Sequence, residues 1–231
     1  MGASGSVREV AQAGDAESLK KMLRRTSIKM TLNSRDDKGQ TVLHAASEDG
    51  KDEVVKILLQ AKANVDIQDE DGRTALHGAV WNGWTNIAKI LIESKANVDI
   101  QNGDGETALQ YAVSNCHMNI SQILINSGAN VNSSDDQGYT ALHYAAEDNN
   151  LAILKSLIES KAIVNATSKD GTTALEIAAQ HDQSGIPTAL IEAKAEVSTI
   201  DNNTSSNQRS EPIRRRQNKG MRGRCRGCCG I

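Results

Sequence analysis

Three histidines are the first residues of this 231-residue sequence that could carry chemistry, because imidazole nitrogens are common ligands of zinc and other transition metals. His44, His77 and His143 each close a Thr-x-Leu-His motif, and the first two lie 33 residues apart. Residues at one position of successive repeats follow one another along the chain of repeats, so they cannot converge on a single ion. We therefore predict that these histidines are structural and bond the neighbouring turn.

Cys116 and His117 form a second candidate pair, a nucleophile beside a base. A catalytic cysteine needs a base that a third group holds in position. The residues around the pair supply no such group, and Cys116 occupies a position that is glycine in other copies of the pattern, such as Gly50 and Gly83. The interpretation is an inert thiol in a turn.

Asp69, Asp71 and Gly72 imitate part of a calcium-binding loop. The first and last ligand positions of that loop would be Ile67 and Gly78, which offer no carboxylate. The sequence also lacks a phosphate-binding glycine loop and the motifs of zinc proteases, kinases and serine hydrolases. We therefore expect no enzyme activity, no cofactor and no metal.

The elements that position these residues repeat every 33 residues. Each copy has a glycine, a threonine two residues later and a leucine two residues after that, and further apolar positions keep the same period. The glycines are Gly39, Gly72, Gly105, Gly138 and Gly171. A pattern held at so many positions predicts stacked copies of one helix–turn–helix unit.

Each copy reads D-x-x-G-x-T-A-L-H, two short amphipathic helices and a closing A-N-V-D/N, and this resembles the ankyrin repeat. The resemblance implies an all-α solenoid with short β-hairpin-like finger loops. The expected repeats are 36–68, 69–101, 102–134, 135–167 and 168–200, the last as a C-terminal cap. Residues 1–35 hold a degenerate capping repeat, and 201–231 are a linker and basic Cys-containing tail whose composition predicts disorder.

Local chemistry fits this assignment. The repeated glycine permits a turn with positive φ, and the threonine is a helix N-cap. The family's usual glycine after the second helix is Lys62, Lys95, Lys161 and Lys194 here and survives only as Gly128. A left-handed conformation costs a lysine about 1 kcal/mol, so we expect Lys95→Gly to raise the melting temperature.

The composition predicts a globular interior built from aliphatic side chains. Hydrophobic residues make up 38% and charged residues 24%, whereas the aromatic residues are two Trp, three Tyr and no Phe. The sequence contains neither a membrane-length apolar run nor an apolar secretory signal. We therefore expect an intracellular, cytoplasmic protein that is monomeric and keeps its cysteines reduced.

Charge is distributed unevenly. Residues 209–231 contain eight basic residues and one acid, so the tail carries +7 and the preceding part of the chain −10. The basic tail includes Arg214, Arg215, Arg216, Lys219, Arg222, Arg224 and Arg226.

The family resemblance implies a concave partner-binding face made by the finger tips and the exposed side of the first helices. The predicted partner-binding residues are Asp37, Gln40, Glu48, Asp49, Glu70, Asp71, Arg73, Trp81, Asn82, Trp84, Asp104, Glu106, Asp136, Tyr139, Glu147 and Asp148. Together with Lys38, Lys169 and Asp170 this face carries a net charge of −8. Such a groove attracts a basic or amphipathic segment and disfavours nucleic acid.

Trp81 and Trp84 have two interpretations. Both replace polar or small residues of the other repeats, so Trp81 could anchor a partner in the groove while Trp84 lies at its rim. The alternative is that both rings pack on the first helix of a neighbouring repeat.

Three interpretations of the tail stay open. The first is a nuclear import signal or loose RNA contact, the second a polybasic membrane anchor, and the third a merely solvated segment. The anchor interpretation draws on candidate lipidation sites at Gly2, Cys225, Cys228 and Cys229, and one lipid alone would bind an anionic membrane only marginally.

The sequence thus predicts a non-catalytic protein-binding adaptor or inhibitor. The alternative is a membrane-tethered or nuclear regulator in which the basic tail sets the location. The opposite charges of tail and face also predict that the tail can fold back on the groove.

Overall fold

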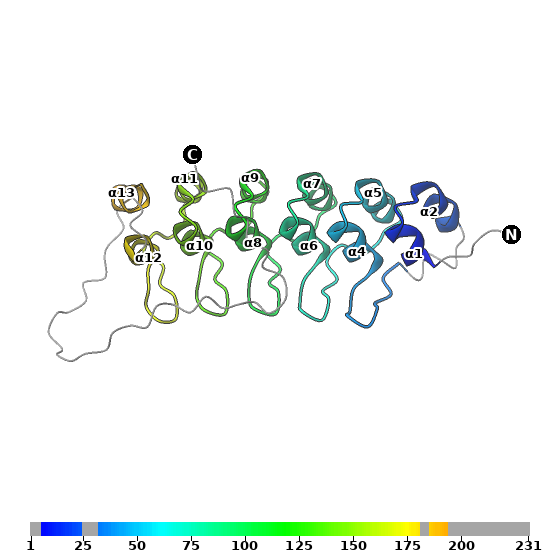
Figure 1. Cartoon of the computed structure of the whole chain (residues 1–231), viewed down its shortest axis with the longest axis horizontal. Coiled ribbons are helices and arrows are strands. Elements are labelled where there is room, and N and C mark those ends of the chain that lie inside the picture. The colour runs from blue at the N-terminus through cyan, green and yellow to red at the C-terminus, as the bar shows by residue number, and fades with distance from the viewer. Residues whose placement is uncertain (1–5, 25–31, 181–184, 194–231) are drawn as a thin grey trace.

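The computed structural model describes residues 6–24, 32–180 and 185–193. Gly2, Lys194 and the basic tail, including its three cysteines, lie outside the described residues. The described chain consists of helix pairs stacked in one direction (Figure 1). The helices are α1 (Val7–Gln12), α2 (Ala16–Leu23), α4 (Val42–Glu48), α5 (Asp52–Gln60), α6 (Ala75–Trp81), α7 (Thr85–Glu93), α8 (Ala108–Ser114), α9 (Met118–Asn126), α10 (Ala141–Glu147), α11 (Leu151–Glu159), α12 (Ala174–Gln180) and α13 (Ile186–Glu192).

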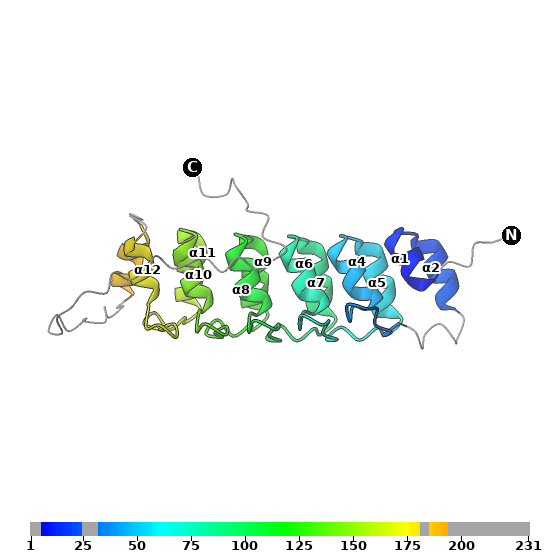
Figure 2. The same ribbon diagram turned by 60° about the horizontal axis from the view of Figure 1, so that its bottom comes forward.

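The pairs form two layers. In Figure 1 an inner layer contains α1, α4, α6, α8, α10 and α12, and an outer layer contains α2, α5, α7, α9, α11 and α13. Finger loops leave the inner layer on the side away from the outer helices, and Figure 2 shows them along one edge of the stack. The expected all-α solenoid is confirmed. Among the described residues, β structure is limited to the isolated bridges Gln101–Thr107, Ser134–Thr140 and Thr167–Thr173.

The interior is aliphatic and continuous from one pair to the next. Leu43, Leu76, Leu109 and Leu142 of the inner helices are each 1% exposed, and the outer-helix leucines such as Leu91 are fully buried. No helix pair could bury such a face alone, so its stability depends on its neighbours. No helix among the described residues is long and apolar enough to cross a membrane.

Local signals in the sequence act as predicted. Thr41 and Thr107 cap α4 and α8 by accepting a hydrogen bond from the N–H three residues later, at 3.4 Å in both helices. Pro187 occupies the first turn of α13, where its missing N–H is tolerated. These caps explain why the inner helices begin at equivalent positions.

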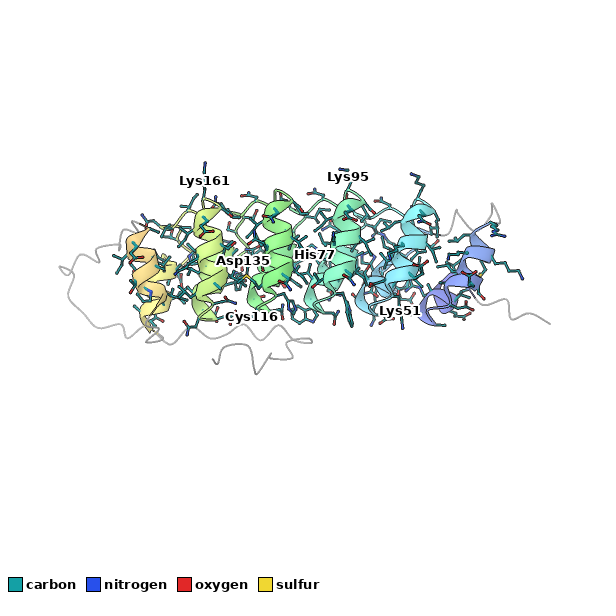
Figure 3. All side chains as sticks on the ribbon, turned by 90° about the horizontal axis from the view of Figure 1, so that it is seen from above. Lys51, His77, Lys95, Cys116, Asp135 and Lys161 are labelled. Atoms are coloured by element: carbon teal, nitrogen blue, oxygen red, sulfur yellow. The ribbon has the colours of Figure 1, made fainter. Side chains whose placement is uncertain are left out.

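Left-handed backbone recurs after the outer helices. Lys62, Lys95 and Lys161 have φ of 71°, 70° and 67°, as expected for residues at the position where the family usually has glycine, and Gly128 has φ of 86°. Figure 3 shows Lys95 and Lys161 along one edge of the solenoid and Cys116 along the opposite edge. Cys116, with φ of 57°, stands in the turn between helices where Gly50 and Gly83 also have positive φ.

Candidate protein-binding face

The histidines that could have held a metal instead join one helix pair to the next finger. Thr74 N–H donates to Nδ1 of His77 over 3.1 Å, and Nε2 of His77 lies 3.3 Å from the carbonyl oxygen of Glu106. His44 and His143 make the same links, with Nε2 at 3.1 Å from the Arg73 oxygen and 3.2 Å from the Thr172 oxygen. The geometry assigns the proton to Nε2, and the predicted structural role is confirmed.

Burial holds these rings in the neutral form. His77 is 1% exposed, and burial lowers its pKa from the ordinary 6.5 to about 4. Burial also lowers the pKa of His44 and of His143.

In the third repeat Gln110 replaces the histidine. Its Oε1 accepts from Thr107 N–H over 2.8 Å and its Nε2 donates to the Tyr139 carbonyl oxygen over 2.7 Å. The role therefore requires an acceptor and a donor, and not a titrating base.

Successive fingers are also joined by backbone hydrogen bonds. The N–H of Gly103 donates to the Asp71 oxygen over 2.7 Å, and the N–H of Asp136 donates to the Asp104 oxygen over 3.0 Å. A side chain on Gly72 or Gly105 would place a Cβ 2.7 Å from a backbone nitrogen of the next finger. These glycines therefore permit both positive φ and the close approach of neighbouring fingers.

The finger tips and the C-terminal ends of the inner helices form one surface, which we call the acidic finger face. Gln40 in a finger donates to Glu48 at the end of α4 over 3.1 Å, which joins the two parts. The exposed acids of this face are Asp37, Asp49, Glu70, Asp71, Asp136 and Asp170, and the half-buried ones are Glu48, Asp104, Glu147 and Asp148. Its exposed Asn82 bonds the carbonyl oxygen of Gly78 over 3.0 Å.

Glu106 does not lie on this exposed surface, contrary to prediction. It is 6% exposed, and its carboxylate accepts from the Tyr144 hydroxyl over 3.1 Å and from Nδ2 of Asn102 over 3.3 Å. The physical reason is that the hydroxyl of Tyr144, one helix pair further on, also reaches Asp135 over 2.6 Å and draws the fingers together around it. Glu106 is thus a connector between fingers.

Arg73 is also committed to its own finger. Its guanidinium donates to Asp69 over 3.0 Å and to Asp71 over 2.8 Å. Asp69 is 6% exposed, and the pKa of Arg73 is raised because Asp69 and Asp71 outweigh the opposing effect of burial. Arg73 therefore reduces the negative charge of the face locally and orders the turn.

Both tryptophans contact a neighbouring helix pair. Trp81 is half-buried, and its ring meets that of Tyr111 edge-on with centroids 5.4 Å apart. Trp84 covers Gly50, donates from Nε1 to the Glu48 oxygen over 2.9 Å, and remains 42% exposed. Both rings therefore pack against an inner helix of a neighbouring repeat, and Trp84 also keeps part of its ring exposed at the edge of the acidic finger face.

Tyr139 lies close to acids from both parts of the acidic finger face. Its ring lies 5.2 Å from that of His143 and 5.7 Å from that of Tyr144. Its pKa is raised first by burial and then by the charges of Glu147, Asp170 and Asp135. Finger acids and helix-end acids therefore act on the same point.

The side chain of His117 contacts the preceding helix pair. Its Nε2 lies 3.5 Å from the Trp81 carbonyl oxygen, and its ring covers Gly83. Among the described residues no group of three or more His, Cys, Asp or Glu could hold a metal ion.

Comparison with known proteins agrees with this geometry. The family model for ankyrin repeats matches residues 8–102, 86–168 and 133–201, so the chain belongs to the ankyrin repeat family. Ankyrin repeat domains mediate protein–protein interaction and are typically non-catalytic, so the solenoid is a protein-interaction domain.

Two solved structures are similar over nearly their whole length. An ankyrin repeat domain from Acinetobacter baumannii AYE is 26% identical with a TM-score of 0.77, covering 82% of this chain and 98% of that one. The ankyrin repeat domain of Bcl-3, a member of the IkappaB protein family, is 25% identical with a TM-score of 0.77, covering 85% of this chain and 89% of that one. A comparison with curated protein sequences gave no significant match.

Proposed function

We propose that the chain is a non-catalytic adaptor or inhibitor that binds a basic or amphipathic protein segment on the acidic finger face. The observation that supports this most directly is the row of exposed acids at equivalent finger positions, Asp37, Glu70, Asp136 and their neighbours. Because these carboxylates lie on one surface, their fields add and attract a cationic segment. Exposed Trp84 supplies apolar area beside the acids.

The backbone of this face is well suited to recognition. Each finger after the first donates a backbone hydrogen bond to the preceding finger and accepts one from a His or Gln of the preceding inner helix. A surface ordered before binding loses less conformational entropy when a partner docks. The proposed partner therefore meets a preformed array of charges.

The test uses the full chain and two synthetic peptides, a poly-arginine peptide and a poly-glutamate peptide of equal length. We expect calorimetry to detect binding of the basic peptide only, weakening about ten-fold or more as ionic strength rises from about 0.05 to about 0.5 M. Asp37→Asn with Glu70→Gln and Asp136→Asn should weaken it further.

The matched control neutralises three acids of the outer layer, Glu53→Gln with Glu93→Gln and Glu159→Gln. Equal losses in the two triple variants would refute the assignment to the finger face. Absence of binding of the basic peptide to the wild-type chain would refute the proposed class of partner.

A further inference from the structure

Trp84 presents an aromatic ring to solvent at the edge of the acidic finger face. Among the described residues three large apolar side chains are exposed, and Trp84, at 42%, is the one aromatic side chain of the three. It is the N-cap residue of α7 and directly follows the turn after α6. Figure 3 marks the edge that carries these turns with the labels Lys51 and Cys116.

The ring is held in place from two sides. A Cβ on Gly50 would lie 2.8 Å from both Cε2 and Cζ2 of Trp84 and 3.1 Å from Cδ2. Because these three bonded atoms are almost equally distant, the backbone of Gly50 meets the ring by its face. The indole Nε1 donates to the carbonyl oxygen of Glu48 over 2.9 Å, so the nitrogen edge is also occupied. The exposed area therefore falls on the opposite face, which is fixed before any ligand arrives.

The other repeats show that a turn at this edge can be covered without an indole. At the position equivalent to Trp84 the first repeat has Lys51, the third His117 and the fourth Asn150. Lys51 and His117 also cover the left-handed glycine of the preceding turn. The large ring of Trp84 therefore adds a flat surface that the repeat itself does not require.

Two carboxylates flank the glycine under this ring. Asp49 is exposed and Asp52 is half-buried, and among the described residues neither takes part in an ion pair. Asp52 accepts from Nδ2 of Asn86, in the first turn of α7, over 3.3 Å. The lysine between the two acids, Lys51, extends toward the preceding turn, where its Nζ would lie 3.8 Å from a Cβ on Gly14. The exposed indole is thus bordered by negative charge.

We propose that the exposed face of Trp84 binds an arginine side chain of the partner segment, with Asp49 and Asp52 opposing its charge. A guanidinium stacks flat on the electron-rich face of an indole while its N–H groups point outward in its own plane, toward carboxylates at the edge of the ring. A lysine ammonium has neither the flat surface nor the in-plane fork. The inference rests on the proposed function, because the arginine belongs to the basic segment expected on the acidic finger face, and it adds a preference for arginine over lysine.

The first experiment compares poly-arginine and poly-lysine peptides of equal length on the full chain by calorimetry. We expect Trp84→Asn, which introduces the residue found at position 150, to weaken poly-arginine binding about three-fold and poly-lysine binding less. The matched control is His117→Asn, the same replacement one repeat further on, which should change neither affinity. No loss in Trp84→Asn, an equal loss for the two peptides, or the same loss in the control would overturn the inference.

The second experiment locates the arginine and leaves Trp84 unchanged. The indole N–H signals of the two tryptophans are recorded by nuclear magnetic resonance and assigned with Trp81→Phe, which removes one of them. On titration with poly-arginine we expect the ring signals of Trp84 to shift saturably and those of Trp81 to stay nearly constant. The arginine side-chain protons should move upfield, because they lie over the ring. Unshifted Trp84 signals at saturating peptide would overturn the inference whatever the stability of the Trp84 variant.

A comparison of variants separates this inference from the proposed function. The finger variant is Asp37→Asn with Glu70→Gln and Asp136→Asn, which leaves Trp84 and its two neighbouring acids intact. If this variant loses affinity for poly-arginine and Trp84→Asn does not, the proposed function stands and the arginine site is wrong. If the finger variant keeps its affinity and Trp84→Asn loses it, the finger acids are refuted as the docking surface and the arginine site stands.

Discussion

The neutral state of His77 makes a testable contribution to acid stability. Its pKa falls from the ordinary 6.5 to about 4 because the ring is buried, so between these values the unfolded chain binds a proton that the folded chain does not. The free energy of unfolding is unaffected above about pH 6.5. It falls as the pH drops toward 4, by about 1.4 kcal/mol per unit, to a total of about 3 kcal/mol.

The perturbation is His77→Gln, because Gln110 already makes both links at the equivalent position. Its amide donates to Tyr139 over 2.7 Å and accepts from Thr107 over 2.8 Å. We expect the free energy of unfolding to be close to wild type at pH 7.5. At pH 4.5 the variant should be about 2.5 kcal/mol more stable than wild type, since the glutamine does not titrate.

The assay is urea unfolding of the full chain, followed by circular dichroism at several pH values between 7.5 and 4.5. The difference between variant and wild type cancels the shared titration of carboxylates. The reverse change, Gln110→His, should create a new loss of stability over the same pH range. A pH-independent difference for His77→Gln would refute the argument that this imidazole is buried and neutral.

Two further predictions concern the backbone and the fingers. Lys95→Gly should stabilise the chain by about 0.5–1 kcal/mol in thermal unfolding, because φ is 70° and glycine removes the left-handed cost while adding chain entropy. The control is Gly128→Ala: its added Cβ would meet no atom within 4 Å, so the free energy of unfolding should fall by about 1 kcal/mol through the positive φ alone. If Lys95→Gly instead destabilised the chain, the lysine side chain would have to make a stabilising contact. Asn102→Asp should cost about 2 kcal/mol in urea unfolding, because it replaces the amide that donates to Glu106 over 3.3 Å by a second carboxylate beside this buried acid; an unchanged midpoint would contradict this role.

Residue patterns predicted the elements of this fold in detail. The 33-residue period predicted the helix pairs, the threonines predicted the caps, and Lys62, Lys95 and Lys161 were expected to be left-handed from their place after the second helix. These features depend on one residue and its immediate neighbours along the chain, so periodicity and local chemistry are sufficient to find them.

The candidate site was less predictable from the same patterns. Register placed Glu106 on the exposed face, yet Tyr144, 38 residues later, buries it. Register also left two interpretations of Trp81, and the structure places its ring against Tyr111 of the next inner helix. In both cases the deciding partner lies in the adjacent helix pair.

The sequence by itself therefore determined the repeating unit, its direction of stacking along the chain and the excess of acids in the finger register. Only the tertiary structure decided which of those acids meet solvent and which join fingers. The physical reason is that a side chain's burial in a solenoid depends on what the next unit places above it. Repeats with the same backbone but different side chains, such as Glu106 at the position equivalent to Arg73, therefore differ in burial.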